Sequence, residues 1–157
     1  MLLRAIEFLG LSIWLGSDVF LSFVVAPGAF AVLASRDDAG AIVGYSLTRM
    51  HLLGIACGMV ILILRALRTR SVGSLAAPAA LFVIGMMVLS MISQVAVTPR
   101  MAALRTQMGS IQATAVENPL LAAFLKLHQV SVLLESGVLL CGFAALYLMV
   151  RELALKR

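Results

Sequence analysis

Residues 119–150 read PLLAAFLKLHQVSVLLESGVLLCGFAALYLMV, and nearly every position in this run is apolar. A helix of this length exceeds the roughly 20 residues that cross a hydrocarbon core. The preceding Asn118 is a good N-cap and Pro119 suits the first helical position. The run therefore predicts a membrane-spanning helix with a defined start.

Three earlier stretches have the same character, at residues 5–34, 41–64 and 75–97. Hydrophobic residues make up 62% of the chain and charged residues 12%, whereas soluble domains average roughly 45–50% and about 25%. The connections are short and leave no room for a soluble catalytic domain. We predict an all-α, integral membrane four-helix bundle that forms a single domain over residues 1–157, with no internal repeat beyond generic helix pairing.

Prolines and charges refine this picture. The first stretch carries Glu7 and Asp18 and is too long for the roughly 7–15-residue core of a signal peptide, so it is expected to remain as a helix. Pro27-Gly28 predicts a kink or an early end of that helix. After the third stretch, residues 101–115 place apolar side chains on one helical face and predict an amphipathic segment on the outer membrane surface before the fourth helix.

The net charge of +5 comes from basic residues near the expected helix ends, which is a membrane pattern and gives no reason to expect nucleic acid as a partner. One side would carry Arg4, Arg65, Arg68, Arg70, Arg151, Lys156 and Arg157. The other side would carry Arg36, Arg49, Arg100, Arg105 and Lys126, diluted by Asp37 and Asp38. The positive-inside rule therefore predicts that both termini are cytoplasmic, in a bacterial-type inner membrane.

The only two histidines, His51 and His128, lie in the second and fourth stretches, each eight or nine residues from the end that faces the same side. This spacing places both imidazoles about 12–14 Å below one membrane surface. Imidazole suits haem iron, copper or zinc, so both residues are candidate metal or haem ligands. The alternative is a hydrogen bond to a helix carbonyl, to Ser90 or to Gln94.

Other polar residues follow helical spacing within the same stretches. Trp14 and Asp18 are four apart, and His128, Ser131 and Glu135 form one stripe. Asp18 and Glu135 are each expected about 22–24 Å from the outer surface. If the stripes face each other, the two carboxyl groups share a polar core with Trp14 and Ser131 that can bind a cation or pass a proton. The alternative is a neutral acid bonded to Trp14 or Ser131.

Sulfur-containing side chains are the remaining candidates. Cys57, Met87 and Met91 are candidate soft-metal ligands, because Met87 and Met91 are four apart and share a helix face. Packing is the alternative for each of them. Cys57 and Cys141 lie at different depths of apolar stretches, so no disulfide is expected.

The spacing Phe124-x3-His128-x2-Ser131-x3-Glu135 resembles the last-helix pattern of the transmembrane protein 205-like family, in which a polar residue, commonly Asn, follows the His by seven positions. Glu135 departs from that pattern by replacing an amide with an acid. Other pieces resemble the family in the same order: Trp14-Leu-Gly16 and Phe20, Phe30 through Gly40 and Gly44, and Thr98-Pro99-Arg100-Met101.

The resemblance implies a four-helix integral membrane protein. Animal members of the family are linked to metal-drug resistance, and the architecture is similar to copper-resistance D proteins and to a haem-binding four-helix protoporphyrinogen oxidase. Together with the polar core, this predicts a small membrane protein that binds or moves a metal ion or metal cofactor, with transport favoured over turnover. The alternatives are a haem-binding membrane oxidoreductase and a structural subunit of a homo-oligomer or a larger membrane complex.

Overall fold

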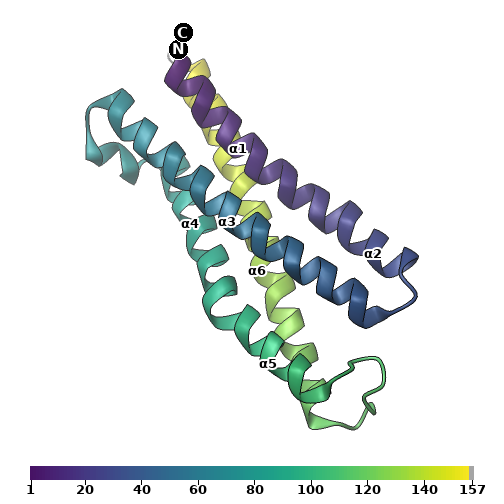
Figure 1. Ribbon diagram of the computed structural model, residues 1–157. Coiled ribbons are helices and arrows are strands. Elements are labelled where there is room, and N and C mark those ends of the chain that lie inside the picture. The colour runs from purple at the N-terminus through teal and green to yellow at the C-terminus, as the bar shows by residue number, and fades with distance from the viewer. Residues whose placement is uncertain (156–157) are drawn as a thin grey trace.

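The computed structural model describes residues 1–155, and all regular structure in this part of the chain is helical (Figure 1). The first long helix comprises α1 (Leu2–Phe20), the π-helical turn η1 (Leu21–Val25) and α2 (Ala26–Val32). The second is α3 (Arg36–Thr69), which a short 3-10 helix, η2 (Val72–Ala76), connects to the third. The third comprises α4 (Pro78–Ile92), the π-helical turn η3 (Ser93–Val97) and α5 (Thr98–Met108), and the fourth is α6 (Pro119–Ala154).

Each of the four long helices has the length and composition needed to cross a membrane, with a mean hydropathy between 1.8 and 2.2 in its most apolar window. The protein is therefore an integral membrane protein with four candidate spans, and the predicted all-α class is confirmed. Lys156 and Arg157, which the charge count assigned to the side of the N-terminus, lie outside the described residues.

The helices run up and down, and α1 lies beside α3 while α4 lies beside α6 (Figure 1). The N-terminus, the end of α6 and the turn of residues 70–77 lie together at what we call the terminal end. The connections at 33–35 and 109–118 lie together at what we call the loop end. The helices thus form two hairpins that pack against each other.

The start of α3 is earlier than expected, at Arg36 and not at residue 41. Ser35 is its N-cap, since the Ser35 hydroxyl accepts a hydrogen bond from the Asp38 amide at 3.2 Å. Asp37 and Asp38 in the first turn also interact favourably with the helix dipole. The helix ends at Thr69, and its C-cap Arg70 has a left-handed φ of 51°.

Neither proline ends its helix, so the early end that was one of the two alternatives expected at Pro27 does not occur. Pro27 and Pro99 each lie two residues beyond a π-helical turn, η1 or η3. Proline offers no amide donor and crowds the carbonyl four residues earlier, and the wider turn relieves both problems without breaking the helix. The third helix consequently runs through Pro99 to Met108, so the expected amphipathic segment 101–115 is helical only in its first half, and a loop over 109–118 follows.

Close packing between α1 and α3 depends on glycine. Trp14 is fully buried, and its indole ring lies where a Cβ on Gly54 would have to be. A Cβ on Gly58 would lie 2.9 Å from the same ring. Small residues let transmembrane helices approach closely, so these two glycines form the recess that holds Trp14.

Candidate functional site

The centre of the bundle holds a direct contact between two ionisable side chains. His51 Nε2 of α3 lies 2.9 Å from Glu135 Oε2 of α6, across the interface between the hairpins. The side chain of His51 is fully buried and that of Glu135 is 12% exposed. A buried pair of this kind is costly in hydrocarbon unless it is well paired, which marks the position as a candidate site.

Asp18 of α1 is the third member of this cluster. Its side chain is fully buried, and Ser22 donates a hydrogen bond to its Oδ1 at 3.3 Å. Its carboxyl group is close enough to that of Glu135 for the two acids to interact. Three helices therefore place two carboxyl groups and one imidazole together.

Several buried polar atoms around this cluster have no hydrogen-bonding partner in the described part of the chain. Three belong to the cluster itself: Asp18 Oδ2, His51 Nδ1 and Glu135 Oε1. Three more belong to its surroundings: Trp14 Nε1, Ser90 Oγ and Ser93 Oγ. Buried polar groups are nearly always paired, so this concentration indicates a site that completes its hydrogen bonds with a proton, water or a small ligand.

Both serines come from the third long helix, Ser90 from α4 and Ser93 from η3. Gln94 of η3 donates to the Thr48 carbonyl of α3 at 3.2 Å, one turn from His51. On the α6 side, a Cβ on Gly137 would lie 3.0 Å from Leu89 of α4. All four long helices thus contribute polar side chains to one layer. Ser93 is the member of this layer that no sequence pattern indicated.

The two predicted histidines are not brought together. His128 is exposed on the outer surface of α6, whereas His51 points into the bundle. The equal depth expected for them is also corrected, because His51 contacts Glu135, which lies seven residues, or about 10 Å along the helix, beyond His128. Because α3 starts at Arg36, His51 lies farther from the start of its helix than it would if the helix began at residue 41. Ser131 lies on the buried side of α6.

The sulfur candidates lie in different surroundings. Cys57 and Cys141 are both free thiols and both partly buried. Met87 lies against Gly58, where its sulfur would be 2.8 Å from an added Cβ. Met91 is 49% exposed on the outer surface of the bundle.

The arrangement does not fit a resident metal or haem. Among the described residues, no three His, Cys, Asp or Glu side chains are arranged to hold a metal ion. Axial ligation of a haem by both histidines would require them to face each other, and His51 faces Glu135 instead. We therefore derive no step that depends on either group.

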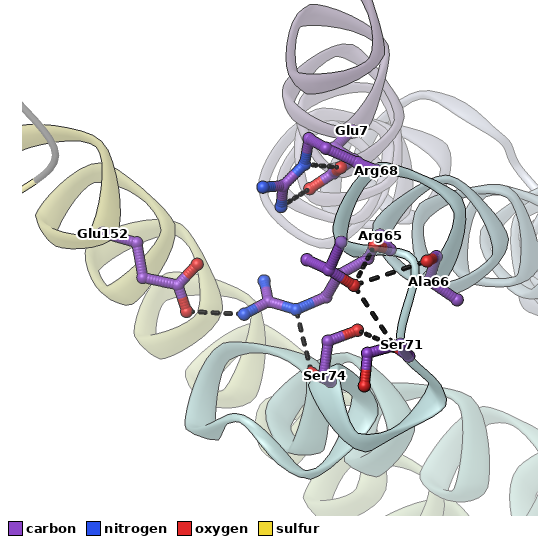
Figure 2. Close-up of polar contacts among 8 residues, drawn as sticks. Glu7, Arg65, Ala66, Arg68, Ser71, Ser74 and Glu152 are labelled. Carbon is purple, nitrogen blue, oxygen red and sulfur yellow. Dashed lines mark hydrogen bonds and ion pairs between the residues drawn. The ribbon is translucent and has the colours of Figure 1, made fainter.

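Two ion pairs close the terminal end of the bundle, and they were not expected from the sequence (Figure 2). Arg68 of α3 donates to both oxygens of the buried Glu7 of α1, at 2.7 and 3.1 Å. Arg65, one turn earlier, donates to Glu152 of α6 at 2.7 Å and to the Ser74 carbonyl at 3.1 Å. The sequence signal was the basic run 65–70 opposite two isolated acids.

A second polar network closes the loop end. Asp37 accepts hydrogen bonds from the Ser110 hydroxyl at 2.5 Å and from the Ile111 amide at 2.8 Å. The Arg36 amide donates to the Gln112 side chain at 3.0 Å. These bonds fasten the loop 109–118 onto the start of α3, so the central cluster lies between two polar closures.

Comparison with known proteins gives one match. Residues 9–110 match the family model described as "Domain of unknown function (DUF4149)", a span that includes Asp18, His51 and Ser90 but not α6. No curated protein and no solved structure matches the chain. Since the matched span is more than half of the chain, the chain belongs to the DUF4149 family.

Proposed function

We propose that this membrane protein takes up and releases a proton at the Asp18–His51–Glu135 cluster, as the binding step of proton-coupled transport across the bilayer. The observation that carries the proposal is the 2.9 Å contact of His51 with Glu135, in a layer where both acids keep an unpartnered buried oxygen. Ionisable residues inside membrane bundles commonly mark ion and proton pathways.

The energetics favour a bound proton. Two unit charges about 4 Å apart repel by roughly 4 kcal/mol at the effective dielectric of a protein. Asp18 and Glu135 would face such repulsion as two carboxylates, and one nearby imidazolium offsets only part of it. A proton on the cluster removes one charge and supplies a donor to an unpartnered oxygen. Electrostatic repulsion therefore favours a proton on the cluster. The His51 imidazole, which contacts Glu135, is a nearby base with which this proton can exchange.

Metal handling is the alternative function that the resemblance to the transmembrane protein 205-like family implies. It can be tested on the same purified protein. The residues that carry the last-helix resemblance lie outside the matched span 9–110, and His128 faces away from the cluster. Metal analysis and an absorption spectrum of the purified protein distinguish the two functions. Stoichiometric copper, zinc or haem that is lost in His51→Ala would replace the proton proposal.

The direct test is infrared spectroscopy of the protein in lipid. A protonated carboxyl group gives a C=O stretching band that an ionised carboxylate lacks, and this band shifts in heavy water if the proton exchanges. We expect such a band in the native protein and its loss or displacement in both Asp18→Asn and Glu135→Gln. Asp38→Asn, which changes an exposed acid at the loop end, is the matched control.

Transport is tested in liposomes that contain a pH-sensitive dye and carry an imposed potassium diffusion potential. Native protein should acidify or alkalinise the lumen faster than empty liposomes, and Glu135→Gln should abolish the difference. A native protein with no exchangeable carboxyl band at any pH would overturn the proposal. An exchangeable band without any flux would retain proton binding and exclude transport of protons.

A further inference from the structure

We infer that the chain consists of two repeats of one helical hairpin, and that Ser90 completes the central site at the position that the second repeat provides opposite Asp18. Ser90 would hold the second nitrogen of His51 through a bridging water. The repeat stands on geometry alone, whereas the proton as the ligand rests on the function proposed above.

The first helices of the two hairpins share an unusual feature at one fixed spacing. A shift of 72 residues carries the π-helical turn Leu21–Val25 onto the π-helical turn Ser93–Val97. The same shift carries Pro27 onto Pro99. Because π-helical turns are rare, their coincidence at the same distance from a proline is strong evidence of equivalence.

Burial follows the same shift. Five buried positions of the first helix fall on five buried positions of the third: Glu7 on Ala79, Leu11 on Val83, Trp14 on Met86, Asp18 on Ser90, and Leu21 on Ser93. The two helices therefore present the same face to the interior although their side chains differ. None of these five pairs is identical in residue type, so the relation between the two helices rests on the position of the buried residues.

The second helices are related by a shift of 84 residues. Buried positions again coincide: Gly54 falls on Val138, Gly58 on Gly142, Ile61 on Ala145 and Arg65 on Met149. This shift also preserves a short sequence pattern, Cys-Gly-x3-Leu-x-Leu, which begins at Cys57 and again at Cys141. The inferred repeat departs from the expectation that the chain has no internal repeat beyond generic helix pairing.

The shifts of 72 and 84 residues differ because the connection within the second hairpin is longer than that within the first. The first helix ends at Val32 and α3 begins at Arg36, whereas the third helix runs to Met108 and α6 begins at Pro119. The second hairpin therefore has a longer tip, made of an extended helix end and the loop 109–118. A longer tip leaves the paired helix faces unchanged.

The contacts agree with a two-fold axis along the bundle. α1 packs on α3 and α4 packs on α6 within the hairpins, while α3 packs on α4 and α1 packs on α6 between them. Both first helices run from the terminal end to the loop end (Figure 1). Such parallel repeats are related by an axis along the membrane normal, and membrane proteins built in this way place their sites at the interface between the repeats.

This axis passes through the proposed site. His51 and Glu135 are 84 residues apart, so they are equivalent positions that touch each other across the axis. Asp18 and Ser90 are likewise equivalent. Because Asp18 lies beside Glu135, the axis places Ser90 beside His51. Ser90 Oγ and His51 Nδ1 are both buried, and neither has a hydrogen-bonding partner among residues 1–155.

The role of Ser90 is tested by nitrogen NMR of the imidazole. His128→Ala, in a protein purified without a histidine tag, leaves His51 as the single histidine of the chain. In that background, Ser90→Ala should shift the Nδ1 resonance of His51, Ser90→Thr should retain it, and Ser93→Ala should change it less. An Nδ1 resonance that is the same in Ser90→Ala and in the parent would overturn the role of Ser90.

The repeat is tested by moving the acid to the equivalent position. Asp18→Ser should lower the thermal unfolding midpoint and remove part of the infrared carboxyl band. Adding Ser90→Asp should restore both, because position 90 has the same relation to the axis. Adding Ser93→Asp to Asp18→Ser is the matched control, since it also moves an acid from the first helix to a buried serine of the third.

The outcomes separate the two proposals. Recovery by Ser90→Asp that exceeds recovery by Ser93→Asp supports the repeat, and equal or smaller recovery overturns it. If the native protein has no carboxyl band, proton binding fails. The unfolding midpoints of the same variants then still decide whether positions 18 and 90 are equivalent.

Discussion

His51 and His128 have the same side chain, but they differ in burial, so substituting them should have different effects on stability. His51 is fully buried and contacts Glu135, while His128 is exposed on the outside of α6. Replacing His51 leaves the Glu135 carboxyl without its partner in a low-dielectric layer, whereas replacing His128 leaves nothing unpaired in the described part of the chain. The loss of a partner is what makes a polar substitution costly.

We therefore expect His51→Ala to destabilise the protein by about 2 kcal/mol. Intramembrane hydrogen bonds average about 0.6 kcal/mol and reach about 1.7 kcal/mol, and the unpaired carboxyl adds to that loss. His128→Ala should stay within about 0.5 kcal/mol of the native protein. Unfolding in mixed detergent micelles, followed by the fluorescence of the single Trp14, measures both. An equal loss in the two variants would contradict this assignment of burial.

A second residue-scale prediction concerns Gly54. Gly54→Ala places a methyl group inside the Trp14 ring, so the helices must move apart at an overpacking cost of about 1–3 kcal/mol. Gly44→Ala on the same helix meets nothing within 4 Å and should be neutral or stabilising by about 0.5–1 kcal/mol. The same unfolding assay and the Trp14 emission maximum measure the effect. A native-like Gly54→Ala variant would show that the recess is not required.

The sequence predicted that His51 and His128 both face the polar core with Asp18 and Glu135, and this prediction is wrong for His128, whose side chain is exposed. The buried stripe of α6 repeats every seven residues through Phe124, Ser131 and Val138. His128 and Glu135 both lie at the edge of this stripe. Whether an edge position is covered depends on the neighbouring helix at that level, and spacing within one helix contains no such information.

At the scale of elements, hydropathy predicted four helices, while their bounds depended on local bonds that hydropathy does not register. The capping bond of Ser35 starts α3 early, and π-helical turns carry two helices through proline. Proline usually signals the end of a helix, so the sequence alone favoured a break at Pro99. The equivalence of the two proline turns is visible only after both helices have been placed.

The contact of α1 with α3 at the terminal end gives a prediction about paired charges. Glu7→Met leaves Arg68 without its partner and should destabilise the protein by about 3 kcal/mol, because Glu7 is only 2% exposed. The double variant with Glu7→Met and Arg68→Met leaves no unpaired charge. It should recover most of that loss, since replacing a buried pair by apolar residues is often neutral.

Thermal unfolding of the single and double variants in the same detergent measures this recovery. Arg68→Met alone is the third corner of the cycle and should cost more than the double variant, because it leaves the buried carboxylate of Glu7 unpaired. A double variant that is as unstable as the sum of its singles would show that the two residues do not interact. In that case Glu7 would have a separate role at this end.

At the scale of the whole molecule, polar contacts occur in three layers along the axis. Ion pairs tie α1, α3 and α6 together at the terminal end, the cluster of Asp18, His51 and Glu135 lies in the middle, and Asp37 holds the loop 109–118 at the other end. Apolar packing around Trp14 and Met86 fills the space between the first two layers. A proton that reaches the centre must pass one of the end closures, so their opening is where transport would be controlled.

We predict the orientation in the membrane from the distribution of basic residues over the two ends. Among the described residues, five arginines lie on the side of the termini, and five lysines and arginines lie on the side of the loop end, where Asp37 and Asp38 also lie. The positive-inside rule counts Lys and Arg near the membrane surface, and Arg49 and Lys126 lie within long helices at some distance from the ends of α3 and α6. The surface count therefore favours cytoplasmic termini more strongly than the total.

We accordingly expect green fluorescent protein fused after residue 157 to fluoresce in cells, because this reporter folds in the cytoplasm and not after export through the general secretory pathway. Alkaline phosphatase, which is active only after export, should be inactive at the same position and active when inserted in the loop 109–118. The opposite pattern of both reporters would reverse the orientation. It would also reverse the side from which a proton first meets the Glu7–Arg68 pair, while leaving the central cluster at the same depth.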